Sequence, residues 1–237
     1  MIDGGDDGEP SITIPRWGPI RVQVDRRLSP ASVSRTTVRL VSGTVGEFVF
    51  PSFDPVRGEL LIELSRPLAV GAFYALSLSD LVDLDGTALG SPVQFLFKVV
   101  PADAPTAPDP MVRPAEVVAM LANRCATGGC HDTSVHAASL VLDSSDGIAL
   151  TALGMPSRQA VSPGATARAG SPGLVGLSIV DPERSSASPS RSYLIYKALG
   201  DSHVLGEAMP PPSHSGPLTQ ADLLDISRWI AAGSPLE

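Results

Sequence analysis

The run Cys125-Ala126-Thr127-Gly128-Gly129-Cys130-His131 says more about the C-terminal half of this 237-residue chain than any other stretch. It holds the two cysteines of the sequence, five positions apart, and a histidine directly after the second one. Two thiols and an adjacent imidazole can attach a haem through thioether bonds while the histidine ligates the iron. Gly128 and Gly129 suit such a loop, because residues without Cβ adopt positive φ and allow close approach of a flat macrocycle.

The spacing of the two cysteines leaves three interpretations open. The common haem-attachment signature has two residues between the cysteines, whereas this chain has four. A small disulfide loop between Cys125 and Cys130 is an arrangement common in exported proteins. A zinc site would need a further ligand from His136, His203 or His214, and none of these forms a closely spaced pair.

A haem iron that transfers electrons usually has a second axial ligand, and a methionine thioether is typical of cytochromes c. Met209 is the leading candidate, because the proline run that follows it makes a stiff, extended segment. Met155, which also precedes a proline, is the competing candidate. Met111 and Met120 are poorer candidates, because one lies in a linker and the other on an apolar helical stripe.

Apolar stripes predict three helices that surround one pocket. The first begins at Pro114, which suits the first turn of a helix, and runs up to the cysteine loop. The second ends at Gly200, a natural C-terminal stop. Thr219 and Asp222 form a capping pair for the third, in which Trp229 is expected to pack against the first helix.

The order of short sequence pieces from about Pro114 to Pro235 resembles the small cytochrome c domains of exported multidomain proteins from planctomycetes and myxobacteria. The pieces are Arg124-Cys125-Ala126, Gly129-Cys130-His131-Asp132, Ala138-Ser139-Leu140-Val141-Leu142, Met155-Pro156-Ser157-Arg158-Gln159, Ile179-Val180-Asp181-Pro182-Glu183, Ser192-Tyr193-Leu194-Ile195-Tyr196-Lys197, Met209-Pro210 and Trp229-Ile230-Ala231-Ala232-Gly233. The resemblance implies one covalent haem c, with Cys125 and Cys130 as the thioether residues. It further implies His131 and Met209 as the axial ligands of the haem iron.

Four further residues have groups that can hydrogen-bond the haem propionates and are candidates for the pocket. They are Tyr193, Ser157, Gln159 and Arg191.

The N-terminal half has a different pattern, with roughly seven short runs of alternating apolar and polar residues typical of strands. Six of these runs are Ile20-Arg21-Val22-Gln23-Val24, Thr37-Val38-Arg39-Leu40-Val41, Glu47-Phe48-Val49-Phe50, Leu60-Leu61-Ile62-Glu63-Leu64, Tyr74-Ala75-Leu76-Ser77-Leu78 and Val93-Gln94-Phe95-Leu96-Phe97-Lys98-Val99. They indicate a β-sandwich of immunoglobulin-like type. Pieces such as Gly71-Ala72-Phe73-Tyr74 and Asp83-Leu84-Asp85-Gly86 resemble the bacterial Ig-like (SbsA-type) domains of exported proteins.

We therefore expect a multidomain fold, an N-terminal all-β Ig-like sandwich followed by a C-terminal all-α cytochrome c domain. The expected parts are a disordered tether (1–10), the sandwich (11–100), a proline-rich linker (101–112) and the cytochrome c domain (113–237).

Composition restricts the partners and the location that we expect. The formal net charge is −8 and no basic patch appears, which argues against nucleic acid and anionic membrane surfaces. No run of eighteen apolar residues is present, so we expect no transmembrane segment. Covalent haem points to a periplasmic or cell-surface protein, so we expect an export signal in the precursor, with or without a lipid anchor.

The sequence thus predicts an exported mono-haem electron carrier with His/Met ligation and a redox protein as its partner. The first alternative is a surface ligand-binding or adhesion protein in which Cys125 and Cys130 form a disulfide. The second is a peroxidase-like haem enzyme, which would need an open distal site.

Overall fold

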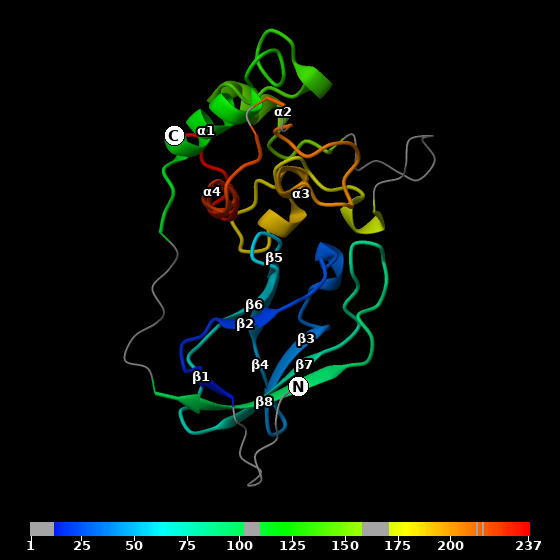
Figure 1. The fold of residues 1–237 in the computed structure, drawn as a ribbon. Coiled ribbons are helices and arrows are strands. Elements are labelled where there is room, and N and C mark those ends of the chain that lie inside the picture. Colours follow the sequence, from blue (N-terminus) through cyan, green and yellow to red (C-terminus); the bar gives the residue numbers. More distant parts are fainter. Residues whose placement is uncertain (1–11, 102–109, 158–170, 212, 215) are drawn as a thin grey trace.

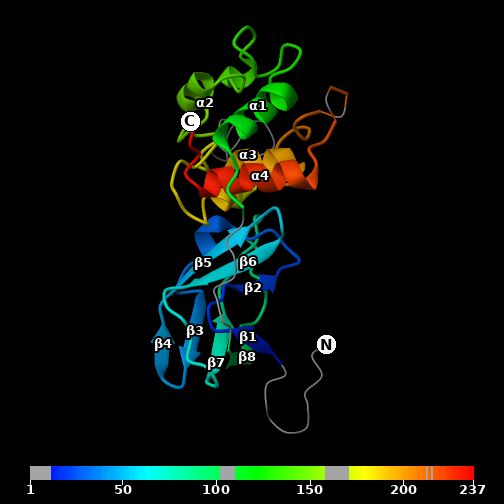
Figure 2. The ribbon, with the colours of Figure 1, turned by 90° about the vertical axis from the view of Figure 1, so that its left-hand side faces the viewer.

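The computed structural model describes residues 12–101, 110–157, 171–211, 213–214 and 216–237. Strands make up the N-terminal region, and the helices of the C-terminal region lie at one end of the sheets (Figures 1 and 2). The expected tether (1–10) and most of the expected linker (101–112) lie outside the described residues.

The strands form a five-stranded and a three-stranded sheet. In spatial order, the first sheet contains β1 (Thr13–Pro15), β8 (Val93–Val100), β7 (Phe73–Leu78), β3 (Val38–Ser42) and β4 (Val45–Glu47). The second contains β2 (Ile20–Gln23), β6 (Glu59–Leu64) and β5 (Val49–Asp54). Only the pairing of β1 with β8 is parallel among the pairings of these described strands.

The two sheets share one apolar core, because alternate residues of each strand point to the same face. Leu40 of β3 pairs with Leu76 of β7, and Phe53 of β5 pairs with Leu60 of β6. All four side chains are buried in a single cluster that draws on both sheets. Most of the alternating runs thus coincide with strands whose apolar faces meet, whereas the run Glu47-Phe48-Val49-Phe50 crosses from the end of β4 to the start of β5.

The described helices are α1 (Pro114–Cys125), α2 (Ser145–Thr151), α3 (Tyr193–Leu199) and α4 (Gln220–Ala231). Single 3-10 turns lie at η1 (Pro30–Ser32), η2 (Ala137–Ser139), η4 (Pro172–Leu174) and η5 (Pro189–Arg191). The predicted caps are present: Pro114 opens α1, Gly200 ends α3 in the left-handed region, and Thr219 forms a capping box with Asp222. None of these helices has the length and apolarity needed to cross a bilayer.

The expected fold class was wrong. Across its described residues the chain is a mixed α/β protein with two sheets and four α-helices, and its C-terminal region is not an all-α cytochrome c domain. Extended segments between the helices form isolated β-bridges that pair Leu153 with Val180 and Ser178 with both Pro156 and Ser192. Pro156 cannot continue α2, which ends at Thr151, and it lies in one of these bridges.

The two regions share apolar packing rather than lying apart. Val56, which follows β5, belongs to the apolar cluster of the helices. Leu84 of the strand region is buried in a second cluster, together with Leu174, Tyr193, Tyr196 and Val204. The backbone also joins the regions, because Gly173 N–H donates to the carbonyl of Leu84 at 2.8 Å.

Gly173→Ala tests how much this junction contributes to stability. A Cβ at residue 173 would lie 2.8 Å from Leu84 Cα and 3.0 Å from its carbonyl oxygen. Because backbone atoms cannot move aside easily, we expect the free energy of unfolding to fall by about 1–3 kcal/mol, measured by urea denaturation. Gly46→Ala is the matched control, since a Cβ there has no neighbour within 4 Å. Equal stability of the two variants would contradict the prediction.

Candidate functional site

A cavity of about 270 Å³ lies within the helical region. Its walls come from α1, α2, α3, α4 and the segments between them. The lining is mostly apolar, and the residues are Leu121, Cys125, His131, Ala138, Ser139, Leu140, Leu142, Leu150, Thr151, Met155, Pro156, Ser157, Ile179, Tyr193, Leu194, Lys197, Ala198, Met209, Leu218 and Ile226. Leu150 is 75% exposed and Met155 is 45% exposed, so this side of the cavity reaches solvent.

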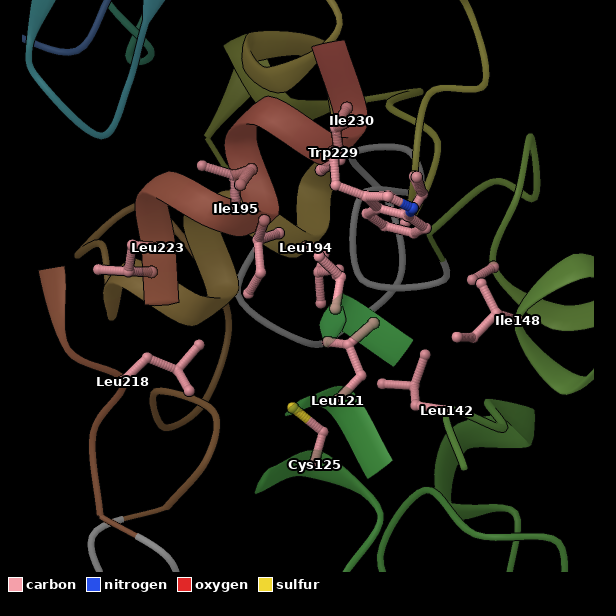
Figure 3. Close-up of a cluster of buried hydrophobic side chains, with 14 of the residues drawn as sticks. Leu121, Cys125, Leu142, Ile148, Leu194, Ile195, Leu218, Leu223, Trp229 and Ile230 are labelled. Carbon is pink, nitrogen blue, oxygen red and sulfur yellow. The ribbon is translucent and has the colours of Figure 1, made fainter. Parts of the chain in front are cut away.

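Cys125 is the last residue of α1 and is buried in the cavity wall. Val117, Leu121 and Cys125 are the buried residues of α1, and their spacing of four puts them on one face. Figure 3 shows the sulfur of Cys125 directed into the apolar cluster. Burial raises the pKa of the Cys125 thiol to about 11, so the thiol is protonated at neutral pH.

The loop after α1 returns the chain to its own helix end. Gly128 and Gly129 have φ values of 62° and 87°, which favour glycine. The backbone N–H of His131 donates to the carbonyl of Cys125 at 3.3 Å. Cys125, Cys130 and His131 thereby line one small cleft with Met209, and both thiols are free rather than joined.

The ring of His131 has a fixed orientation at the cavity wall. Its Nδ1 lies 2.9 Å from the carbonyl oxygen of Ala137, which only accepts, so Nδ1 carries the proton of the neutral ring. The backbone of Leu140 makes a further hydrogen bond to the ring. Burial lowers the pKa of the imidazole, which therefore is neutral at neutral pH. The carbonyl comes from an unusual turn, in which His136, Ala138 and Ser139 all have left-handed backbone conformations.

Met209 lines the same cavity as His131. Its backbone N–H donates to the carbonyl of Lys197 in α3 at 3.1 Å, which ties the residue to the cavity wall. Met155, the competing methionine, also lines the cavity but is partly exposed. The structure thus brings the side chains of both candidate methionines to the cavity that His131 lines. Of the two methionines, Met209 also lines the small cleft with His131, and Met155 does not.

Lys197 is a cavity residue that sequence reasoning missed. It lies four positions after Tyr193 in α3, so the two side chains share a helix face. Burial lowers the pKa of the ammonium group, which donates a short hydrogen bond to the carbonyl of Leu205. The spacing of four could have indicated a shared face, but only the packing shows that this face meets the cavity.

The other candidate pocket residues have different outcomes. Tyr193 and Ser157 line the cavity, and both are buried. Arg191 is not among the described cavity residues, and its guanidinium group pairs with Asp181 and Glu183 at 2.6 Å each. Gln159 lies outside the described residues.

Of the histidines considered for zinc, His214 lines the small cleft that Cys125, Cys130 and His131 also line, whereas His203 lies elsewhere. His203 pairs with Asp201 and Asp85, at the junction with the strand region. In the part of the chain that the structure describes, no three His, Cys, Asp or Glu side chains come together as a metal site.

The burial of Cys125 predicts unequal reactivity of the two thiols in protein without haem. With a pKa of about 11, only about one molecule in a thousand carries the Cys125 thiolate at pH 8. We expect iodoacetamide to label the half-buried Cys130 first, and labelling of Cys125 to rise about tenfold per pH unit.

Peptide mass spectrometry of Cys125→Ala and Cys130→Ala isolates each thiol. Equal labelling rates of the two variants would contradict the prediction. Labelling of the wild-type protein only after reduction would support the disulfide alternative.

Comparison with known proteins gives no family for this chain. No family model matches, and no curated protein matches. Two similar solved structures are a crystal structure of the S-layer protein rSbsC(31-844) and a structure of domains 1–6 of the surface layer protein SbsC. The first has 11% identity and a TM-score of 0.34, covering 44% of this chain and 16% of that protein. The second has 11% identity and a TM-score of 0.30, covering 39% of this chain and 13% of that protein.

Proposed function

We propose that this chain is an exported electron-transfer protein that binds one covalent haem c in the cavity of its helical region. Cys125 and Cys130 would form the thioethers, and His131 and Met209 would be the axial ligands. The observation that carries the proposal is the convergence of these four residues on one cleft at the edge of an apolar cavity. We expect a redox protein as the partner and a location outside the cytoplasm.

The chemistry of these donors fits a haem iron. An imidazole whose Nδ1 is held by a backbone carbonyl presents Nε2 in a defined orientation, which is how ligating histidines are usually supported. A thioether is a soft, neutral ligand that favours ferrous iron and a relatively high potential. Because both thiols are free, they are available for thioether bonds.

The lining of the cavity also fits a large, flat and mostly apolar group. Leu121, Leu142 and Leu194 are buried side chains in its wall. The buried ammonium of Lys197 and the hydroxyl of Tyr193 can pair with anionic propionates. The volume of about 270 Å³ is slightly below the usual range for ligand pockets, roughly 300–1,000 Å³.

The residues of the chain would then bind, orient and shield the cofactor rather than act on a substrate. Haem supplies a one-electron redox centre when bound. The apolar wall excludes water, which disfavours the extra charge of the ferric state and so raises the potential. The opening near Leu150 and Met155 provides an exposed edge at which a redox partner can approach.

The test is to produce the protein in cells with haem-attachment machinery and to measure intact mass and visible absorption after denaturation. We expect the mass of one haem to remain with the denatured chain. The double variant Cys125→Ala/Cys130→Ala should lose this mass, because no thioether can form. Wild-type protein that carries no denaturation-resistant haem would overturn the proposal.

The choice between the two cavity methionines is a second prediction. In haem-loaded protein, Met209→Ala should open the sixth coordination position and lower the reduction potential, because the thioether stabilises ferrous iron. Met155→Ala is the matched control, since Met155 lines the same cavity and should leave the potential nearly unchanged. Spectroelectrochemical titration gives both potentials. A lower potential in Met155→Ala alone would reverse the assignment.

A further inference from the structure

The segment that leads from α3 to Met209 is attached to the strand region at its beginning. The carboxylate of Asp201, whose side chain is 6% exposed, accepts a hydrogen bond from Arg27 Nε at 3.1 Å. Arg27 follows β2 in the strand region, whereas Asp201 follows α3 in the helical region. The ion pair therefore joins the two regions through residues that are 174 positions apart in the sequence. A buried carboxylate needs such a partner, because leaving its charge unpaired in the protein interior is costly.

Arg27 is itself held in place within the strand region. Its guanidinium group also donates to the carbonyl of Pro55, and its backbone carbonyl accepts from Leu84 N–H at 2.9 Å. A side chain fixed at both ends loses little further freedom when it pairs with Asp201. Arg27 therefore provides a fixed position for that carboxylate.

The residues after Asp201 lie against the strand region as well. The ring of His203 contacts Asp201 through Nδ1, and its Nε2 lies 3.4 Å from a carboxylate oxygen of Asp85. Val204 is buried in the cluster that contains Leu84. The first part of the segment is thus held by charge, hydrogen bonding and apolar packing.

The later part of the segment is held by α3. The ammonium group of Lys197 donates to the carbonyl of Leu205, and the carbonyl of Lys197 accepts from Met209 N–H. Only a few residues separate the contacts with the strand region from the contacts with α3. Displacement of Asp201 would therefore be transmitted to Met209 over a short stretch of chain.

We infer that Arg27 is a positioning residue for Met209, acting through Asp201 and the segment that connects it to the cavity. This role rests on the proposed function, in which Met209 ligates the iron. It gives the strand region a part in the redox site, because one of its side chains acts together with α3 to hold the segment that carries the proposed distal ligand.

The first test uses haem-free protein and hydrogen exchange. In Arg27→Ala, we expect the amides of Val204 and Met209 to exchange about tenfold faster, the change expected for one lost charge-assisted hydrogen bond. The matched control is Arg21→Ala, which removes an ion pair to Glu59 of similar length, 3.0 Å, that lies within the strand region alone. Arg27→Lys should restore part of the protection, because the ammonium can still pair with Asp201.

A double variant tests whether Arg27 acts through Asp201. Arg27→Ala/Asp201→Asn should accelerate exchange no more than Arg27→Ala alone, because residues of one ion pair are coupled. Additive effects would overturn the route through Asp201. Equal acceleration of the α1 amides would show general loosening instead of local displacement, and would also overturn the inference.

Haem-loaded protein provides the second test. We expect Arg27→Ala to lower the reduction potential and to weaken the absorption band of the thioether–iron(III) bond, whereas Arg21→Ala should change neither. If wild-type protein carries haem and Arg27→Ala matches Arg21→Ala in exchange and potential, the role of Arg27 is overturned alone. Wild-type protein without covalent haem would overturn the proposed function itself.

Discussion

The position of Cys125 on the buried face of α1 is the constraint on which the candidate site depends. Val117, Leu121 and Cys125 follow one another at a spacing of four, so the packing that buries the first two also buries the thiol. α1 packs against α4 in the same cluster, where Trp229 is fully enclosed. The cysteine is therefore placed by the same apolar packing that holds the helices together, and the loop that follows only has to return to it.

The return of that loop explains why the imidazole and the thiol meet. The hydrogen bond from His131 N–H to the carbonyl of Cys125 closes the loop, and the bond from His131 Nδ1 to Ala137 fixes the ring. Left-handed conformations at Ala138 and Ser139 are unfavourable for residues other than glycine. Such conformations persist where the surrounding structure imposes them, and they often mark functional sites.

Capping residues in the sequence predicted the ends of three helices, whereas the sequence contained no clear signal for the pairing of segments that lie far apart in the chain. Pro114, Gly200 and the Thr219/Asp222 pair marked helix ends that the structure contains, because capping depends on neighbouring residues alone. α2 was not predicted, since it is short and buries only Ile148. The expectation of an all-α C-terminal domain was wrong because the β-bridges at Ser178 join separate segments and leave no periodic pattern in the sequence.

The same distinction applies to the candidate site. Local chemistry singled out Cys125, Cys130, His131 and Met209, and these residues do lie together. It also suggested Arg191, which instead pairs with two carboxylates, because sequence does not show which charges become neighbours. Lys197 and Arg27 were missed for this reason, since their roles come from packing between remote segments.

The strand region is more than a spacer in front of the helices. Tyr193 lines the cavity and also belongs to the apolar cluster around Leu84. The helix α3 therefore carries residues that line the cavity. Tyr196 of the same helix also belongs to the cluster around Leu84 and is fully buried between the two regions. Because close-packed interiors transmit small displacements rather than absorb them, a change at the junction would reach the cavity wall directly. Packing at this junction therefore belongs to the physical description of the site, together with the residues that face the cavity itself.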